Sequence, residues 1–188
     1  MARIDLITAR DQIGEARHPE FDQIVAVLGR VGGPFGVLMH SPGLAEKVCL
    51  AGAQVRLRSE LTMDERELAV LATAREKDAA YEWSVHAQVA RDHGVRPEAI
   101  AAIRDRCDTS RLEDDERDII EYTRELLRTN RVGAARFDAL RRRHGVRWLV
   151  ELTATVGQYQ YIAAINNAFE IEPRPAGDVL PVPPPQPD

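Results

Sequence analysis

Apolar residues recur at helical spacing along most of the chain, and helix start and stop signals divide this pattern into segments. The pattern predicts helices at residues 19–31, from 42 through at least 55, 62–77, 79–93, 97–106, from about 114, 134–145 and 147–170. Thr62 and Glu65 form a capping-box pair at the start of one helix, and Gly94 and Gly145 follow the ends of two others. The sequence therefore predicts an all-α bundle of about seven or eight helices.

The two ends of the chain lack this pattern. Residues 1–18 are expected to form an irregular N-terminal arm, and residues 19–172 the helical domain. Residues 173–188 hold seven of the eleven prolines, so we expect an extended or disordered tail.

Two short motifs repeat at the same separation, which suggests an internal duplication. Asp64–Glu67 resembles Asp115–Asp118, and His93–Arg96 recurs as His144–Arg147. Chance similarity between helix-start and helix-stop signals is the alternative. The second copy has Asp118 and Phe137 in place of Glu67 and His86, so only the first keeps the polar residues.

Composition and charge narrow the classes of function. The net charge of -5 argues against a nucleic-acid surface. No segment has the roughly 20 apolar residues that a membrane span needs, and the first residues lack the apolar core of a secretory signal. We therefore expect a cytoplasmic protein with no membrane partner. Cys49 and Cys107 do not form a Cys-x-x-Cys pair, which argues against a redox dithiol, a zinc site or a disulfide framework.

Three ionisable residues fall on helix faces that should be buried. On a helical wheel Glu67 lies within the apolar arc of its helix, between Val70 and Leu71. Glu82 and His86 share the inner face of the next helix at i,i+4 spacing. A carboxylate there costs several kcal/mol unless it is paired or protonated. Because a short connection favours antiparallel packing of the two helices, the three groups can converge in one site.

Two other interpretations of this cluster stay open. A buried Glu–His pair can be a satisfied polar network without chemistry, and two carboxylates with one histidine could hold a divalent ion, although this spacing is not specific to metal sites. An enclosed pocket of a few hundred Å³ beside His86 would favour an enzyme, and a filled core would favour a scaffold. His40, just before the Ser41-Pro42 helix start, fits a surface or capping role better than a catalytic one.

The motifs together resemble the carboxymuconolactone decarboxylase family, which shares the AhpD-like fold. The segments that carry the resemblance lie between about residues 38 and 170: His40–Ala45, Leu61–Glu67, Tyr81-Glu82-Trp83 with His86 and Ala90, Gly94-Val95, and Gly157–Tyr159 with Asn166. The thiol-peroxidase branch of the family has a Cys-x-x-Cys motif that falls here on Ala79 and Glu82. The chain therefore resembles the branch without these cysteines.

The resemblance implies the fold, a function and an assembly. It implies an all-α enzyme without organic cofactor or metal, acting by acid/base chemistry on a small unsaturated lactone or carboxylic acid, and a homo-oligomer, a trimer or hexamer. His86 would be the catalytic acid/base, Glu67 would orient it, and Glu82 would be a second carboxyl. The substrate-binding residues would be His40, Tyr81, Trp83, Tyr159 and Asn166. The alternative is a non-redox AhpD-like protein that binds a small molecule or has a structural role.

Overall fold

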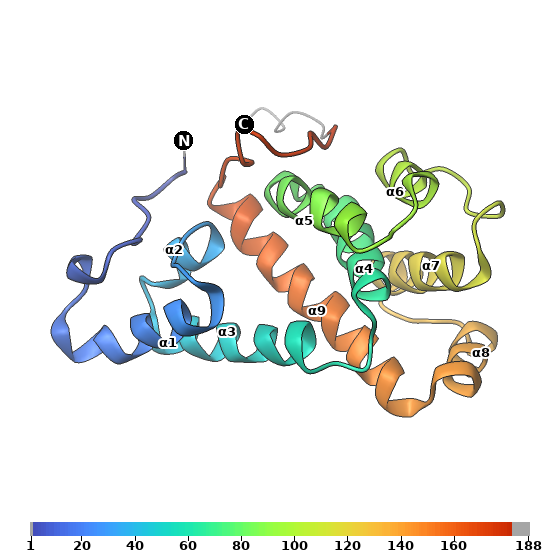
Figure 1. Ribbon diagram of the computed structural model, residues 1–188, viewed down its shortest axis with the longest axis horizontal. Coiled ribbons are helices and arrows are strands. Elements are labelled where there is room, and N and C mark those ends of the chain that lie inside the picture. The colour runs from blue at the N-terminus through green and yellow to red at the C-terminus, as the bar shows by residue number, and fades with distance from the viewer. Residues whose placement is uncertain (1, 182–188) are drawn as a thin grey trace.

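The computed structural model describes residues 2–181, and within them every regular element is a helix (Figure 1). In this described part of the chain, two 3₁₀ turns, Arg10–Gln12 and Glu15–Arg17, precede nine α-helices. The helices are α1 (His18–Leu28), α2 (Pro34–Leu38), α3 (Pro42–Leu57), α4 (Met63–Glu76), α5 (Ala80–Asp92), α6 (Pro97–Arg104), α7 (Asp114–Thr129), α8 (Ala134–His144) and α9 (Val146–Ala168). All eight expected helices are present, and the prediction of an all-α fold is confirmed.

The additional helix is α2, which lies where the sequence indicated only a break. The preceding helix ends earlier than the glycine pair predicted, at Leu28, because Gly29 adopts a left-handed conformation with φ 79°. After Gly32 and Gly33, Pro34 begins a five-residue helix before Ser41. Five residues are too few to show helical periodicity, so the sequence pattern could not reveal this helix.

The helix boundaries follow the capping signals. The Glu65 carboxylate accepts a hydrogen bond from the backbone N–H of Thr62 at 2.9 Å, as a capping box requires. The same carboxylate accepts from the Trp148 indole N–H at 3.0 Å, which ties the start of α4 to α9. Gly94 and Gly145 adopt positive φ angles of 88° and 90° after α5 and α8, and glycine does so at little steric cost.

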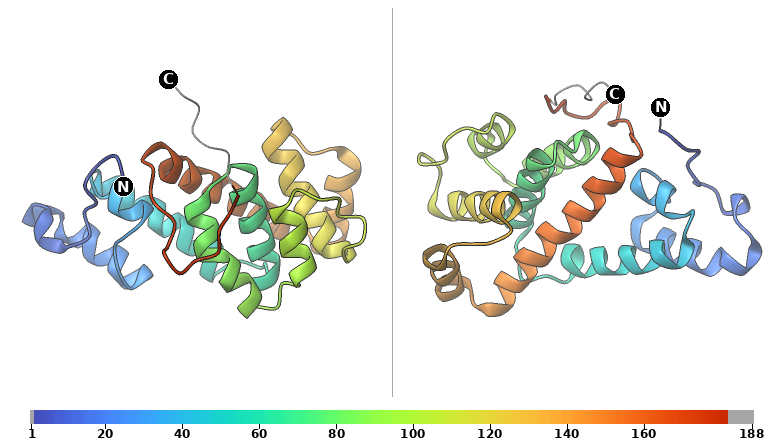
Figure 2. Two further views of the ribbon diagram at one scale, coloured as in Figure 1. Left: turned by 90° about the horizontal axis from the view of Figure 1, so that it is seen from above. Right: turned by 180° about the vertical axis from the view of Figure 1, so that it is seen from behind.

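The long helix α9 joins two hydrophobic cores (Figures 1 and 2). The larger core is built around α4, whose residues from Arg66 to Arg75 are all buried, and it draws on α5, α6, α7 and α9. The smaller core lies between α1, α2 and α3, and Ile162 of α9 packs into it. The site described below lies where the two cores meet. No helix among residues 2–181 is long and apolar enough to cross a membrane.

The second sequence repeat does not reproduce the buried polar pair of the first. Asp118 forms ion pairs with Arg136 and Arg143, and Phe137 is 42% exposed. The positions that match Glu67 and His86 in the second copy thus form no buried polar pair.

Candidate active site

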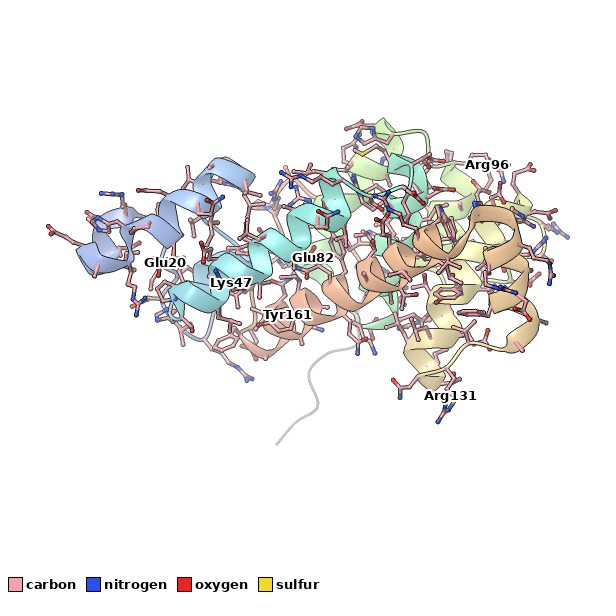
Figure 3. The ribbon with its side chains drawn as sticks, turned by 90° about the horizontal axis from the view of Figure 1, so that it is seen from below. Glu20, Lys47, Glu82, Arg96, Arg131 and Tyr161 are labelled. Carbon is pink, nitrogen blue, oxygen red and sulfur yellow. The ribbon has the colours of Figure 1, made fainter. Side chains whose placement is uncertain are left out.

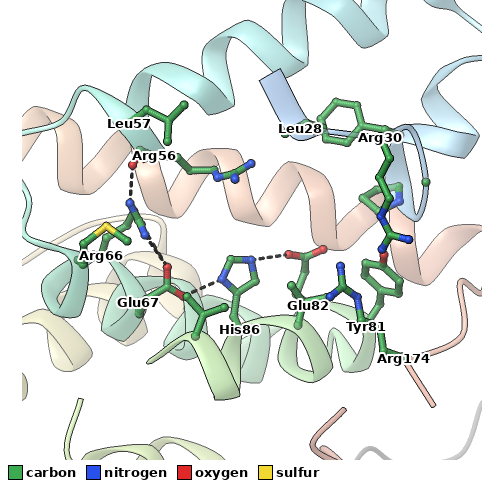
Figure 4. Close-up of a pocket in the computed structure, with 16 residues that line it drawn as sticks. Leu28, Arg30, Arg56, Leu57, Arg66, Glu67, Tyr81, Glu82, His86 and Arg174 are labelled. Atoms are coloured by element: carbon green, nitrogen blue, oxygen red, sulfur yellow. Dashed lines mark hydrogen bonds and ion pairs between the residues drawn. The ribbon is translucent and has the colours of Figure 1, made fainter. Parts of the chain in front are cut away.

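A continuous row of polar side chains runs from Arg66 of α4 to Glu82 of α5 (Figure 4), and Asn166 of α9 continues it. Arg66 donates from Nε and Nη2 to Oε1 of Glu67, at 3.1 and 3.0 Å. The other oxygen of Glu67 lies 2.7 Å from Nδ1 of His86. On the far side of the ring, Nε2 of His86 lies 3.5 Å from Oε2 of Glu82, whose Oε1 accepts from Nδ2 of Asn166 at 2.8 Å. The three predicted catalytic residues are therefore neighbours.

Helix geometry explains this row. Glu67 lies near the middle of α4, and α5 follows after the short link of residues 77–79, so the two helices pack side by side. Glu82 and His86 are one turn apart on the face of α5 that meets α4 and α9. Figure 3 shows Glu82 among the helices, whereas Arg131 projects from the edge of the molecule. Glu67 and Glu82 are 1% and 5% exposed, so both carboxyls depend on protein partners rather than water.

The two carboxyls have opposite electrostatic surroundings. Burial raises the pKa of Glu67, but hydrogen bonds and charge from His86 and Arg66 outweigh it and hold that pKa below its usual value. Burial also raises the pKa of Glu82, and there the charge of His86 and the hydrogen bond from Asn166 do not compensate. Glu67 is thus the ionised carboxylate, and Glu82 is the group that more readily holds a proton.

This difference fixes the role of each histidine nitrogen. An ionised carboxylate only accepts hydrogen bonds, so Nδ1 of His86 carries the proton shared with Glu67. Nε2 then faces Glu82 and is the nitrogen that can take up or give away a proton. The arrangement is that of an oriented general acid/base with a second proton-holding group beside it.

His86, Glu67 and Glu82 open into a pocket of about 350 Å³. Its lining includes Tyr81 and, besides Arg66, three further arginines, Arg30, Arg56 and Arg174, from three different parts of the chain (Figure 4). None of these three forms an ion pair with a carboxylate of residues 2–181. Unpaired guanidinium groups around a pocket favour an anionic ligand.

A smaller cavity of about 80 Å³ lies behind Glu82 and His86. Glu82 and His86 border both spaces, and the rear cavity is closed by Tyr159, Ile162 and Cys49. The ring of Tyr159 meets that of His86 edge-on with centroids 5.1 Å apart, which limits rotation of the imidazole. Burial and the charge of Glu82 raise the pKa of the Tyr159 hydroxyl, so it stays protonated.

Of the five residues expected to bind substrate, three lie at the site and two do not. Tyr81 lines the main pocket, Tyr159 lines the rear cavity, and Asn166 contacts Glu82. His40 is exposed, and its Nε2 donates to the Asp5 carbonyl at 2.9 Å, so it holds the N-terminal arm rather than the site. Trp83 is 1% exposed within the larger core and does not line the pocket, because it lies one residue, about 100°, around α5 from Glu82.

Sequence reasoning missed the arginines of the site. Arg66 stands at the start of α4, where a charged residue usually faces water, yet it is 6% exposed. Arg30 lies just beyond Gly29, which ends α1 earlier than the sequence predicted, and Arg174 lies in the proline-rich segment after α9. Among residues 2–181, no group of three or more His, Cys, Asp or Glu side chains is arranged to hold a metal ion.

Comparisons with known proteins agree with the fold. The sequence model of the carboxymuconolactone decarboxylase family matches residues 42–125, and no curated protein sequence matches the chain. An uncharacterized peroxidase-related protein with an alkylhydroperoxidase AhpD core, from Ralstonia eutropha JMP134, is similar over 93% of both chains, with a TM-score of 0.75 and 17% identity.

Two further solved structures resemble the chain over nearly its whole length. A peroxidase-related protein from Silicibacter sp. TM1040 has a TM-score of 0.72 and 16% identity over 93% of this chain and 92% of its own. The debrominase Bmp8, in complex with 2,3,4-tribromopyrrole, has a TM-score of 0.70 and 16% identity over 94% of this chain and 95% of its own. At these identities the similarity establishes the fold.

Proposed function

We propose that this chain, which belongs to the carboxymuconolactone decarboxylase family and has the AhpD-like fold, is an enzyme. It would use acid/base chemistry and no cofactor. Its substrate would be a small unsaturated lactone or carboxylic acid, and its reaction decarboxylation or a related proton transfer. The observation that carries this proposal is His86, held between an ionised and a proton-holding carboxyl at the wall of a 350 Å³ pocket. A pocket of that size is adequate for a small organic acid.

Decarboxylation by these residues would proceed without a cofactor. The bond between the substrate's carboxylate carbon and the ring breaks, CO₂ leaves, and the electron pair moves into the unsaturated lactone as an enolate. Arg56 would stabilise the negative charge that develops on the lactone oxygen. Glu82 would pass its proton to Nε2 of His86, and Nε2 would deliver that proton to carbon while Glu67 keeps the imidazole in orientation. Uptake of a proton from water, through Glu82, would restore the starting state.

The pocket has an apolar wall and a charged wall: Leu28, Pro34 and Phe35 form the first, which continues into the rear cavity, and the arginines form the second. The carboxylate that is lost reacts fastest when it is poorly solvated, which favours the part walled by Leu28, Pro34 and Phe35. A second anionic group of the substrate, or the developing enolate oxygen, would lie toward Arg56 and Arg174. This division predicts that charge-neutral esters of a substrate bind more weakly than the acid.

A substrate screen with a matched pair of variants tests the proposal. Unsaturated lactone acids and β-keto acids are offered to the wild type, and released CO₂ is measured. His86→Gln should abolish the release from any active compound, whereas His93→Gln, the same substitution at an exposed position just after α5, should retain it. Turnover that survives His86→Gln would refute the catalytic role. Tight binding of the acids without any CO₂ release would support the non-redox binding protein instead.

A further inference from the structure

The chain that follows α9 does not leave the molecule but crosses the surface of α5. Figures 1 and 2 show this segment, red in both, passing along α5 after the end of the long helix. We call residues 173–181 the C-terminal strap. It lies outside residues 42–125, to which the family match extends.

The strap fits α5 closely at its middle. A Cβ atom added at Gly177 would lie 2.5 Å from the backbone oxygen of Ser84 and 2.6 Å from its Cβ, so only glycine allows this approach. The backbone N–H of Arg174 donates to Oγ of Ser84 at 3.0 Å, and that hydroxyl donates to the carbonyl of Tyr81 at 2.7 Å. The strap is thus attached to the same turn of α5 that carries Tyr81 and Glu82.

Further contacts hold the end of the strap. Asp178 pairs with Arg91 of α5, and Leu180 is 4% exposed within the larger core. Nη1 of Arg75 donates to the carbonyl of Pro181 at 2.8 Å. An apolar anchor, an ion pair and a glycine contact at three successive points define one docked path, which a loosely attached tail would not have.

The consequence of this path is the position of Arg174. Its side chain lines the main pocket beside Tyr81 and Glu82, and it forms no ion pair with any carboxylate of residues 2–181 (Figure 4). A strap that served only to cover α5 would not need a free guanidinium at the pocket. The charge of Arg174 also opposes the rise in the pKa of Glu82 that burial causes.

We propose that the C-terminal strap completes the active site and that Arg174 is a substrate-binding residue that contacts the anionic group of the substrate. The identity of the ligand rests on the proposed function, whereas the docked position of the strap does not. Two changes separate the position of the strap from the charge that it carries. Gly177→Ala keeps every charge but forces the strap away from Ser84, and Arg174→Gln removes the charge but keeps the backbone N–H that bonds Ser84.

Each change has a matched control in the full-length protein. Gly14→Ala adds the same methyl group where nothing lies within 4 Å. Arg142→Gln removes the same charge from an exposed position on α8. Hydrogen exchange of the backbone amides in the strap reports docking, and a ¹³C titration of the Glu82 carboxyl reports whether the charge of Arg174 reaches the site.

The proposal predicts a distinct pattern across the four variants. Gly177→Ala should speed exchange of the Arg174 amide by about tenfold or more and raise the pKa of Glu82. Arg174→Gln should leave the exchange unchanged and raise the pKa of Glu82, because a positive charge that stabilises the ionised carboxylate is lost. The two controls should change neither. A Glu82 titration unmoved by Arg174→Gln, or exchange unmoved by Gly177→Ala, would overturn the proposal.

Kinetics then test the contact with substrate. On any acid that the wild type turns over, Arg174→Gln should raise KM by about tenfold and change kcat little, since one charge-assisted hydrogen bond to the bound anion is lost. An unchanged KM would contradict the substrate-binding role even if the strap is docked. If the wild type turns over no acid, the proposed function fails, while exchange and titration still decide the place of the strap.

Discussion

The two buried glutamates of the site should respond in opposite ways to the same substitution. Glu67→Gln and Glu82→Gln each replace one carboxyl oxygen by an amide nitrogen of nearly the same size, at positions that are 1% and 5% exposed. The difference in their effects therefore reports charge rather than volume. Urea unfolding at one fixed protein concentration measures both, because association would otherwise shift the midpoint.

Glu67→Gln should be strongly destabilising at neutral pH. The carboxylate accepts two hydrogen bonds from Arg66 and one from His86. The substitution leaves the Arg66 guanidinium, 6% exposed, without an anionic partner. Breaking a buried pair in this way costs about 3–5 kcal/mol, and because the new amide oxygen still accepts from Arg66 we expect about 3 kcal/mol. With a slope of about 2 kcal/mol per molar urea, the midpoint falls by about 1.5 M.

Glu82→Gln should be neutral or stabilising under the same conditions. Its pKa is raised by burial, so the folded protein disfavours the ionised form relative to the unfolded chain. Such a group lowers stability as the pH rises above its unfolded value of about 4.3, and glutamine removes that loss. The new amide oxygen still accepts the hydrogen bond from Asn166.

The pH dependence separates the two glutamates further. The pKa of Glu67 is lowered in the folded protein, so its contribution is fully present above its unfolded value of about 4.3 and is lost as pH falls through the folded value. The cost of Glu67→Gln should therefore shrink in acid, provided the fold persists there. Equal losses of stability for the two variants, or a larger loss for Glu82→Gln at pH 7, would refute the assignment of the ionised and the protonated carboxyl.

Three other predictions concern the thiols, the pocket wall and the assembly. We expect any peroxide turnover to be at background and to be unchanged by Cys49→Ser or Cys107→Ser, because the two thiols do not form a Cys-x-x-Cys pair. Burial also raises the pKa of the Cys49 thiol. An assay in which either change abolished turnover would contradict this. Gly33→Ala should lower stability by about 1–3 kcal/mol, since its φ is 55° and the new Cβ would lie 2.1 Å from the Tyr81 hydroxyl. Tyr81→Ala removes the hydroxyl and also the ring carbons that would lie 2.5 and 2.9 Å from the added Cβ, so Gly33→Ala should cost less stability in that background, and an equal cost would argue against the clash. Light scattering should give a multiple of the 21.0 kDa chain mass, and a monomer alone at micromolar concentration would refute the expected homo-oligomer.

The parts of the fold that the sequence predicts are those with local causes. Thr62 with Glu65, Gly94 and Gly145 each act within a few residues, so helix starts and ends could be derived from them. The helix α2 has no such signal beyond Pro34. A local sequence pattern also cannot predict that α9 contributes to both cores, because this depends on which helices pack together.

The same distinction explains which site residues could be predicted. Glu67 and His86 were recognisable because each interrupts the apolar face of its own helix. Arg66 was not, because α4 is buried on all sides and a helical wheel has no means to show that its polar side is also covered. Arg174 lies in a proline-rich segment whose place depends on Ser84 and on a core contact far away in the sequence.

The position of Glu82 connects the resemblance to the chemistry. In the thiol-peroxidase branch, from which this chain differs, the second cysteine of the Cys-x-x-Cys motif falls at the position of Glu82, one helical turn before His86. Here the carboxyl oxygen lies 3.5 Å from Nε2 of His86, while Glu67 holds the opposite nitrogen. A histidine oriented in this way can exchange a proton with either group, but a thiol can also be oxidised and a carboxyl cannot. Because burial raises the pKa of Glu82, the same helical frame favours reversible proton transfer at this position over redox chemistry.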